Sequence, residues 1–324
     1  MIVVAGEALI DLVPDRAAPA ATGDELPALR PARGGGPYNT AMALGRLGVP
    51  TAFCSRVSTD GFGEALLSRL HQDGVDTALV QRGPEPTTLA VASIGADGSA
   101  GFGFYVQGTA DRLFALPPAL PEGTTALSLG TCSLVLEPGA SAYEALLRRE
   151  AGRGVFTALD PNIRTGLIPD ADAYRARFRG WLPYVGLLKL SIEDARWLAG
   201  SGDTPAGSDE AVEAAIREWA AAGPAAVVCT HGGDGLSVLC QDGSRWAVPG
   251  ERVEIVDTIG AGDTVNAALL HRLAAHDALS APALAKLGEA AWQDVLGFAA
   301  RAAAITCSRA GAEPPYAAEL AVGA

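Results

Sequence analysis

Short, almost continuously apolar runs alternate with segments of helical periodicity along most of this 324-residue chain. The apolar runs lie at 2–5, 51–57, 126–130, 155–160, 187–190 and 226–230. The helical patterns lie at 37–47, 63–70, 142–150, 173–182, 209–222 and over most of 260–307. Strands that alternate with helices are joined by crossovers and so run parallel, and unbroken apolar runs indicate strands covered on both faces. The sequence therefore predicts an α/β fold, a doubly wound and mostly parallel sheet flanked by helices.

Two segments do not follow this alternation, namely 15–33 and a predicted hairpin at 89–106. In the hairpin, the strand-like runs 89–94 and 103–106 flank Asp97-Gly98, and Asp242-Gly243 marks a second hairpin within 236–248. We interpret 12–33 and 87–110 as a small β lid on a single domain that spans 1–324. Ordinary surface excursions are the alternative. The chain length suits one large domain with such an appendage.

The charge balance is strongly acidic, with 24 Lys and Arg against 37 Asp and Glu and a formal charge of −13. This excess argues against a nucleic-acid partner and against an anionic membrane surface. The five cysteines are scattered and show no metal-binding spacing, which favours buried thiols in a reducing compartment. The N-terminus does not resemble a signal peptide, and no apolar window is long enough to span a bilayer. The sequence therefore predicts a cytoplasmic protein.

The segment Asp257-Thr258-Ile259-Gly260-Ala261-Gly262-Asp263-Thr264 carries the clearest chemical signal. It follows a strand-like apolar run at 253–256 and opens a helical pattern. The first amides of a helix point outward with partial positive charge, and glycines let a ligand approach them closely, so the segment predicts an anion hole. A carboxylate at Asp263 would repel a phosphate, but it suits a base that takes a proton from an attacking hydroxyl. The combination indicates phosphoryl transfer to an alcohol.

Most common nucleotide-binding motifs are absent. The chain has only two lysines, Lys189 and Lys286, and each is followed by Leu, so no Walker A sequence is present. The run 260–265 lacks the third small residue of a dinucleotide fingerprint, which excludes a typical nicotinamide-dependent dehydrogenase. No His-Arg-Asp or Asp-Phe-Gly sequence appears, which excludes a protein kinase. The four histidines make no metal or catalytic spacing.

Two distant motifs together resemble the signatures of PfkB/ribokinase-like carbohydrate kinases. The run from Asp257 to Asp263 resembles the C-terminal signature, and Gly34-Gly35-Gly36-Pro37-Tyr38-Asn39-Thr40-Ala41 followed by Leu44-Gly45-Arg46-Leu47-Gly48 resembles the N-terminal one. Within that family, 6–11, 108–111, 160–164 and 303–312 resemble the corresponding segments of bacterial fructokinases. The resemblance covers essentially the whole chain. It implies a ribokinase-like fold and the use of ATP and Mg²⁺.

The resemblance also implies roles around the sugar and the transferred phosphate. Asp263 would be the general base, and the amides of Gly260, Ala261 and Gly262 would stabilise the transferred phosphoryl group. The sugar would lie among Asp11, Gly35, Gly36 and Asn39, with Asn162 and Arg164 near the acceptor and the phosphate. Asp11 is expected just beyond the first strand, where ligands bind in open α/β sheets. The alternatives are a turn cap for Asp11, a plain hinge for the glycines and a structural pair between Asp160 and Arg164.

The resemblance places the nucleotide along two further loops. Thr230, Gly232 and Gly235 would bind the ATP phosphates, although a tight turn explains these glycines as well, and 300–311 would shape the adenine pocket. Many relatives carry Asn-x-x-Glu where this chain has Ser191 and Asp194, so Asp194 would reach Mg²⁺ through water. A helix N-cap at Ser191 is an equally good explanation. Asp257 would contribute to a monovalent-cation site for K⁺, although Ile259 replaces a frequent Thr.

We therefore predict an ATP-dependent kinase that converts D-fructose to fructose 6-phosphate. The alternative acceptors are 2-keto-3-deoxygluconate, ribose and a nucleoside. Few arginines lie near the predicted lid, among them Arg30, Arg33 and Arg112, which favours a neutral sugar. A non-catalytic sugar or nucleotide sensor on the same fold is the alternative from another class, but it would not need Asp263. Because lids pair between subunits in relatives, we also expect a homodimer.

Overall fold

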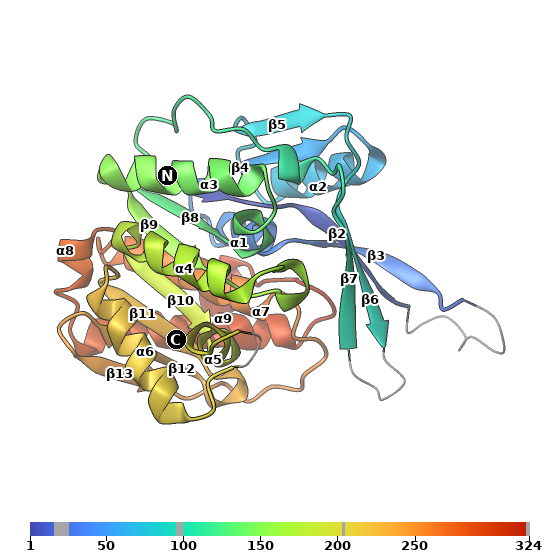
Figure 1. Cartoon of the computed structure of the whole chain (residues 1–324). Coiled ribbons are helices and arrows are strands. Elements are labelled where there is room, and N and C mark those ends of the chain that lie inside the picture. Colours follow the sequence, from blue (N-terminus) through green and yellow to red (C-terminus); the bar gives the residue numbers. More distant parts are fainter. Residues whose placement is uncertain (16–25, 95–99, 203–204, 322–324) are drawn as a thin grey trace.

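A computed structural model describes residues 1–15, 26–94, 100–202 and 205–321. Its centre is a nine-stranded sheet in the order β13-β12-β11-β10-β9-β8-β1-β4-β5 (Figure 1). The strands are β1 (Ile2–Ala5), β4 (Thr51–Ser58), β5 (Val80–Gly83), β8 (Ala126–Gly130), β9 (Phe156–Asp160), β10 (Leu187–Ser191), β11 (Ala226–Thr230), β12 (Leu236–Cys240) and β13 (Arg245–Val248). Among these strands only the pairs β11–β12 and β12–β13 are antiparallel, and β12–β13 is the hairpin predicted at 236–248. The predicted doubly wound α/β fold is confirmed.

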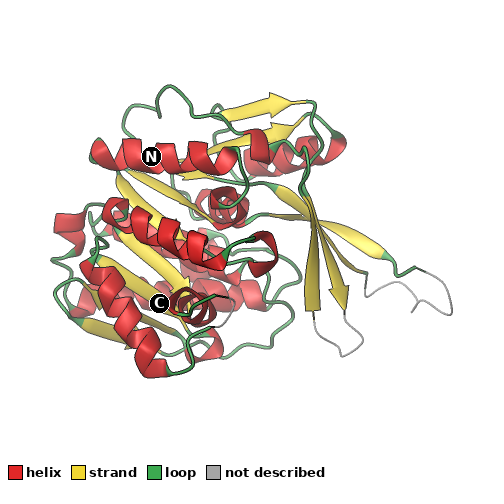
Figure 2. Cartoon of the chain, in the orientation of Figure 1, coloured by secondary structure: helices red, strands yellow, loops and turns green. Residues whose placement is uncertain are grey.

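Helices cover both faces of this sheet (Figure 2). They are α1 (Gly36–Arg46), α2 (Gly61–Gln72), α3 (Gly139–Gly152), α4 (Ala171–Trp181), α5 (Ile192–Ala199), α6 (Asp209–Ala221), α7 (Ala261–Ala275), α8 (Ala281–Leu284), α9 (Glu289–Cys307) and α10 (Ala317–Leu320). Strand β1 shows why two layers form, because its side chains alternate between the faces. Ile2 and Val4 pack in one buried cluster with α1, α2, α7 and α9, whereas Val3 and Ala5 pack in another with α3 to α6.

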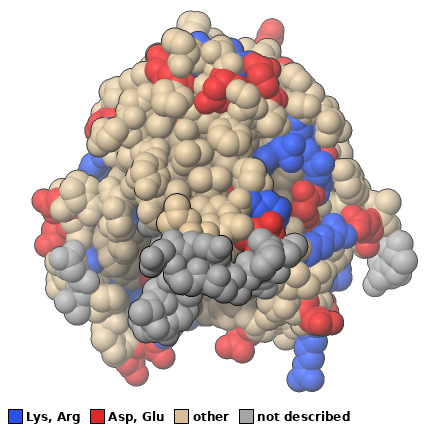
Figure 3. Space-filling view, turned by 90° about the vertical axis from the view of Figure 1, so that its right-hand side faces the viewer, with Lys and Arg blue, Asp and Glu red and all other residues tan. Residues whose placement is uncertain are grey.

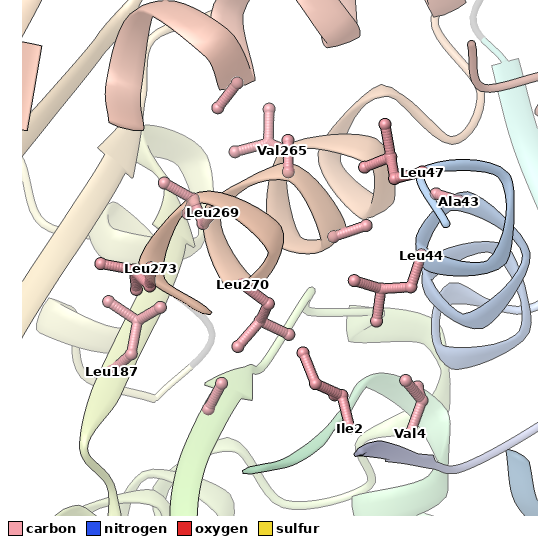
Figure 4. Close-up of a cluster of buried hydrophobic side chains, with 14 of the residues drawn as sticks. Ile2, Val4, Ala43, Leu44, Leu47, Leu187, Val265, Leu269, Leu270 and Leu273 are labelled. Atoms are coloured by element: carbon pink, nitrogen blue, oxygen red, sulfur yellow. The ribbon is translucent and has the colours of Figure 1, made fainter. Parts of the chain in front are cut away.

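Helix α7 begins within the anion-hole segment, and it is fixed by the buried core that it shares with β1 and α1. Leu44 of α1 and Leu270 of α7 point toward Ile2 and Val4 of the sheet (Figure 4). These side chains are almost completely buried. The N-terminus of α7 is therefore held at a fixed position relative to the glycines that begin α1.

A second, four-stranded sheet projects from one side of the molecule (Figure 1). Its order is β3-β2-β6-β7, with β2 (Leu9–Pro14), β3 (Leu29–Gly34), β6 (Leu89–Ile94) and β7 (Ala100–Tyr105). Strands β6 and β7 pair antiparallel, so the predicted hairpin is confirmed, although its Asp97-Gly98 turn lies outside the described residues. Whether this sheet acts as a lid with the boundaries 12–33 and 87–110 stays a prediction.

The strand predicted at 253–256 is wrong. These residues form an irregular segment, and Val253, Ile255 and Val256 are substantially exposed. The side chains of Val253 and Ile255 belong to the surface around a cavity, as described below, so an apolar run here does not indicate a sheet strand. Within the described residues, the longest apolar helix still falls short of what a bilayer crossing requires.

Candidate active site

A cavity of about 230 Å³ lies where the two sheets meet. Its walls come from the start of α1, the start of α7, the loop after β9 and the four-stranded sheet. The sequence-predicted residues that line it are Asp11, Gly35, Gly36, Asn39, Asn162, Arg164, Gly260, Gly262 and Asp263. Residues more than 250 positions apart in the chain are thus gathered around one space.

Asp263 occupies the first turn of α7 and is almost completely buried. Gly260 precedes it as the N-cap in a left-handed conformation with φ of 76°, and a Cβ there would lie 2.5 Å from that of Ala312. One carboxylate oxygen of Asp263, Oδ2, accepts a hydrogen bond from Asn39 Nδ2 at 2.9 Å. Burial raises the pKa of Asp263 to about 6, although the Asn39 hydrogen bond opposes this shift. A carboxylate with this pKa and orientation suits a base near neutral pH.

Gly36, the first residue of α1, approaches this carboxylate more closely than a residue with a side chain could. A Cβ on Gly36 would lie 2.5 Å from Thr131 Cγ2 and 3.1 Å from Asp263 Oδ1. Gly35 has φ of 106°, and a Cβ there would lie 2.7 Å from the Glu7 carbonyl oxygen. A plain hinge does not need such clearance, so Gly36 keeps space open beside Asp263 and Gly35 lets the chain pass close to the backbone of Glu7.

Asp11 reaches the cavity from the four-stranded sheet. The expected position just beyond the first strand of the large sheet is wrong, because Asp11 lies inside β2, paired with Ala32 and Ala90. Its carboxylate lines the cavity together with Phe104 of β7. Burial raises the pKa of Asp11 to about 6, and the charge of Arg164 partly offsets the shift. The turn-cap alternative does not fit this place in a strand.

The loop after β9 contributes Asn162 and Arg164. Asn162 has a positive φ of 40°, which is uncommon for a residue with a side chain. Arg164 Nη1 donates to Asn162 Oδ1 at 2.7 Å and to its carbonyl oxygen at 3.1 Å, so the two side chains form one unit at the cavity wall. The alternative pair between Asp160 and Arg164 is not formed, because Asp160 Oδ2 accepts from Lys189 Nζ at 2.7 Å.

Sequence reasoning missed Glu7 as a residue of this site. Its buried carboxylate accepts hydrogen bonds from the amides of Gly36 (3.2 Å) and Ser133 (3.0 Å) and from the hydroxyl of Thr131. Burial raises the pKa of Glu7 to about 7 despite these hydrogen bonds. Glu7 thus ties the glycine loop before α1 to the end of β8. The signal in the sequence was a charged residue directly after an apolar strand.

A second cavity of about 560 Å³ lies on the other side of the anion-hole segment. Thr230, Gly232 and Gly235 line it from the end of β11 and the turn that follows, and Ala300, Ala303, Ala304 and Cys307 line it from α9. Val253 and Ile255 contribute side chains from the irregular segment. The turn alternative for the glycines is also correct, since Gly232–Asp234 form a 3-10 turn. Thr258 and Gly262 line both cavities, so the two spaces meet at the N-terminus of α7.

Ser191 and Asp194 line neither cavity. Ser191 caps α5 in a capping box with Asp194, as the N-cap alternative predicts. Asp194 Oδ1 also accepts from the amide of Ile163 at 2.8 Å, which fixes the loop that carries Asn162. Asp257 joins two segments, because its carboxylate accepts from the amides of Ile259 (3.0 Å) and Gly311 (2.9 Å). Within the described ranges, no group of three or more His, Cys, Asp or Glu residues is arranged to hold a metal ion.

Known proteins resemble the chain over almost its whole length. Residues 1–318 match the pfkB family carbohydrate kinase. A fructokinase of Rhizobium leguminosarum bv. trifolii is 38% identical over 293 residues, which are 90% of this chain and 85% of that protein. The structure of a Xylella fastidiosa fructokinase with bound ATP has a TM-score of 0.86 at 26% identity, covering 99% of this chain and 97% of that one.

A third relative was solved with both substrate-side and nucleotide-side ligands. It is a fructokinase double mutant from Vibrio cholerae O395 bound to fructose, ADP and potassium ion, with a TM-score of 0.80 at 25% identity over 99% of this chain and 97% of that one. The resemblance found in the two glycine motifs therefore holds for the whole chain. The protein belongs to the pfkB family of carbohydrate kinases.

Proposed function

We propose that the protein is an ATP-dependent fructokinase that converts D-fructose to fructose 6-phosphate. One observation carries the proposal: Asp263 stands at the N-terminus of α7, where the polar cavity meets the larger cavity lined by α9. A sugar in the first cavity and ATP in the second would therefore face each other across Gly262 and Asp263.

The reaction follows from this arrangement. Asp263 takes the proton of the attacking primary hydroxyl, whose oxygen forms a bond to the γ-phosphorus while the bond to the β-phosphate oxygen breaks and ADP leaves. The amides of Gly260, Ala261 and Gly262, at the positive end of the α7 dipole, stabilise charge on the transferred group. Positioning and electrostatics of this kind supply most of the catalysis in phosphoryl transfer.

The charges of the polar cavity favour a neutral polyol over an acidic acceptor. Among the described lining residues, Glu7, Asp11 and Asp263 are acidic and only Arg164 is basic. Carboxylates accept hydrogen bonds from hydroxyl groups, whereas a carboxylate-bearing sugar would be repelled. This agrees with fructose, the ligand of the Vibrio cholerae relative, and disfavours 2-keto-3-deoxygluconate.

On the nucleotide side, Thr230, Gly232 and Gly235 would bind the phosphates, and Ala303 and its α9 neighbours would contact the base. Mg²⁺ bound to the phosphates supplies charge neutralisation. Both carboxylate oxygens of Asp194 accept backbone hydrogen bonds, so this residue fits only an indirect role through water. Asp257 would shape a K⁺ site through the loops that it joins.

The four-stranded sheet would act as the lid of the sugar cavity, to which it contributes Asp11, Ala90 and Phe104. Acidic and basic side chains are interspersed on the face beside this sheet (Figure 3), which does not resemble a nucleic-acid surface. We further infer a cytoplasmic homodimer in which the lids of two subunits pair, and light scattering on the purified protein tests its mass.

A panel assay tests the proposed function. The purified protein is incubated with ATP, Mg²⁺ and either fructose, ribose, 2-keto-3-deoxygluconate or a nucleoside, ADP formation is followed, and the product is identified by NMR. We expect fructose to give the highest kcat/KM and a 6-phosphate product. Turnover of another acceptor with none of fructose would overturn the choice of sugar, and calorimetric binding without ADP formation would indicate a sensor.

A further inference from the structure

The anion-hole segment rests on a buried lysine that the sequence did not place in the site. Lys189 lies in β10 and is 3% exposed. A Cβ on Gly262 would lie only 3.0 Å from Lys189 Nζ, so the ammonium group lies directly beneath the residue that lines both cavities. The absence of a Walker A sequence therefore does not mean that the phosphate site lacks a lysine.

The ammonium group is held in place but not saturated. Lys189 Nζ donates to Asp160 Oδ2 at 2.7 Å, and within the described part of the chain this is its only hydrogen bond. An ammonium carries three N–H groups, so two remain available. Asp160 fixes the position of the cation without using all of its hydrogen-bonding capacity.

Asp160 and Asp263 line the same small cavity of about 10 Å³ behind the active site. Asp160 on β9 contacts Lys189 directly, and the negative charges of Asp194 on α5 and Asp263 on α7 also act on the lysine. The positive charge of Arg164 acts on Asp160. Burial opposes the charged form of Lys189, but these carboxylates outweigh it and raise the pKa of the lysine. A charged ammonium is therefore retained under the anion hole.

We propose that Lys189, fixed by Asp160, is a positioning residue that supplies the positive charge beneath Gly262 and acts through this loop on the transferred phosphoryl group and on Asp263. The inference rests on the proposed kinase function. In this role, Lys189 adds a full positive charge to the partial positive charges of the backbone amides in the anion hole. The inference also assigns opposite effects to the two members of the ion pair, because Lys189 lowers and Asp160 raises the pKa of the Asp263 base.

The test compares Lys189→Met, Asp160→Asn, the double variant and Lys286→Met, a matched control at the only other lysine, which is exposed on the surface. For each protein, kcat and KM for ATP and fructose are measured, and kcat/KM is followed over pH. Lys189→Met should lower kcat by about 10²–10³-fold, as the loss of one group that stabilises transition-state charge does, with a much smaller change in either KM.

The pH profiles distinguish this role from a merely structural one. Relative to wild type, the acid limb should move to higher pH in Lys189→Met and to lower pH in Asp160→Asn. A structural defect alone would not move the two limbs in opposite directions. Turnover of Lys189→Met equal to that of Lys286→Met, or acid limbs that stay at the wild-type position in both single variants, would overturn the proposal.

The double variant keeps the test decisive if a single variant does not fold, because it leaves no unpaired buried ion. We expect it to melt near the wild-type temperature and still to lose about 10²-fold in kcat, and a turnover close to wild type would overturn the proposal. Wild-type turnover is measured first. Its absence would refute the kinase function and this inference with it, whereas normal wild-type turnover with an unaffected double variant would refute the inference alone.

Discussion

The two cavities that meet at Gly262 differ in the balance of polar and apolar residues that line them. The first is lined by carboxylates, amides and one guanidinium, of which Glu7, Asn39 and Asp263 are buried. The second is lined mainly by glycines and by small apolar side chains such as Ala300, Ala303 and Val265, and its charged lining residues are Glu251 and Arg252. Hydroxyl groups have to be bound by directed acceptors, whereas a nucleotide base can be bound by shape and its phosphates by backbone amides. Charge changes should therefore affect the first cavity, and volume changes the second.

Loss of the base should have the largest effect. Asp263→Asn keeps the shape of the side chain and can still accept from Asn39, but it cannot take a proton. We expect kcat to fall by about 10²–10⁴-fold while calorimetry still detects the binding of fructose and ATP. Asp277→Asn, at the exposed opposite end of α7, is the matched control. Near-normal turnover of Asp263→Asn would refute the assignment of the base.

The wild-type pH profile gives a second measure of the same residue. Burial raises the pKa of Asp263 to about 6, and the base has to be ionised to act. The value of kcat/KM should therefore fall as the pH drops through about 6 and level off above it. An acid limb near pH 4, the ordinary range of an aspartate, would show that the carboxylate is not the desolvated group described here.

The next largest effect is expected at Asp11, on the sugar side only. Asp11→Asn removes the charge that we propose accepts sugar hydroxyls, so KM for fructose should rise by about 10–100-fold, since hydrogen bonds to charged groups contribute about 1.5–3 kcal/mol. KM for ATP should stay close to the wild-type value. An equal rise in both constants would contradict the separation of the two cavities.

A volume change in the second cavity should give a smaller effect, and it should raise KM for ATP rather than KM for fructose. Ala303→Phe fills part of the cavity beside α9, and overpacking of about 1–3 kcal/mol corresponds to a rise of about fivefold or more in KM for ATP. KM for fructose should not change. Ala290→Phe, at the exposed start of the same helix, controls for the effect of a bulky side chain on α9. A larger rise in KM for fructose than in KM for ATP would contradict the separation of the two cavities.

The comparison also explains which features the sequence could predict. Strands β8 and β11 are predicted to the residue, because an unbroken apolar run has few other uses than a covered strand. The run at 253–256 is also mostly apolar, apart from Glu254, but its Val253 and Ile255 line a cavity, and composition alone does not distinguish a sheet interior from a ligand pocket. Strand β2 was missed because it carries Asp11 into the site, so its pattern is not that of a core strand.

The charged residues that sequence reasoning missed share one property. Glu7 and Lys189 are both buried and paired with groups from distant segments, Ser133 in one case and Asp160 in the other. A charged residue in an apolar run is a visible signal, but its partner is set by the tertiary fold. Glycine motifs are different, because the backbone chemistry that they permit is local and can be recognised without knowing what lies opposite.

The smallest effect should be a gain in stability from Asp11→Asn. Burial raises the folded-state pKa of Asp11 from 3.8 to about 6, so the carboxyl favours folding below pH 4 and loses this contribution as the pH rises through 6. Asparagine does not titrate, so the variant should gain stability over wild type above pH 6 and show no gain below pH 4. Because Asp11 is only half-buried by surface area, we expect about 1 kcal/mol, or about 1–2 °C in Tm at pH 8.

Differential scanning calorimetry of Asp11→Asn and wild type at pH 4 and pH 8 measures this gain, with Glu122→Gln as the control at an exposed carboxylate. If the variant binds fructose less well yet melts at a higher temperature at pH 8, the negative charge of Asp11 strengthens fructose binding but lowers the stability of the fold. A gain of equal size at pH 4 would instead point to better packing of the amide. In that case, the difference between the more polar first cavity and the more apolar second cavity would still account for ligand recognition, but it would not account for the stability of the fold.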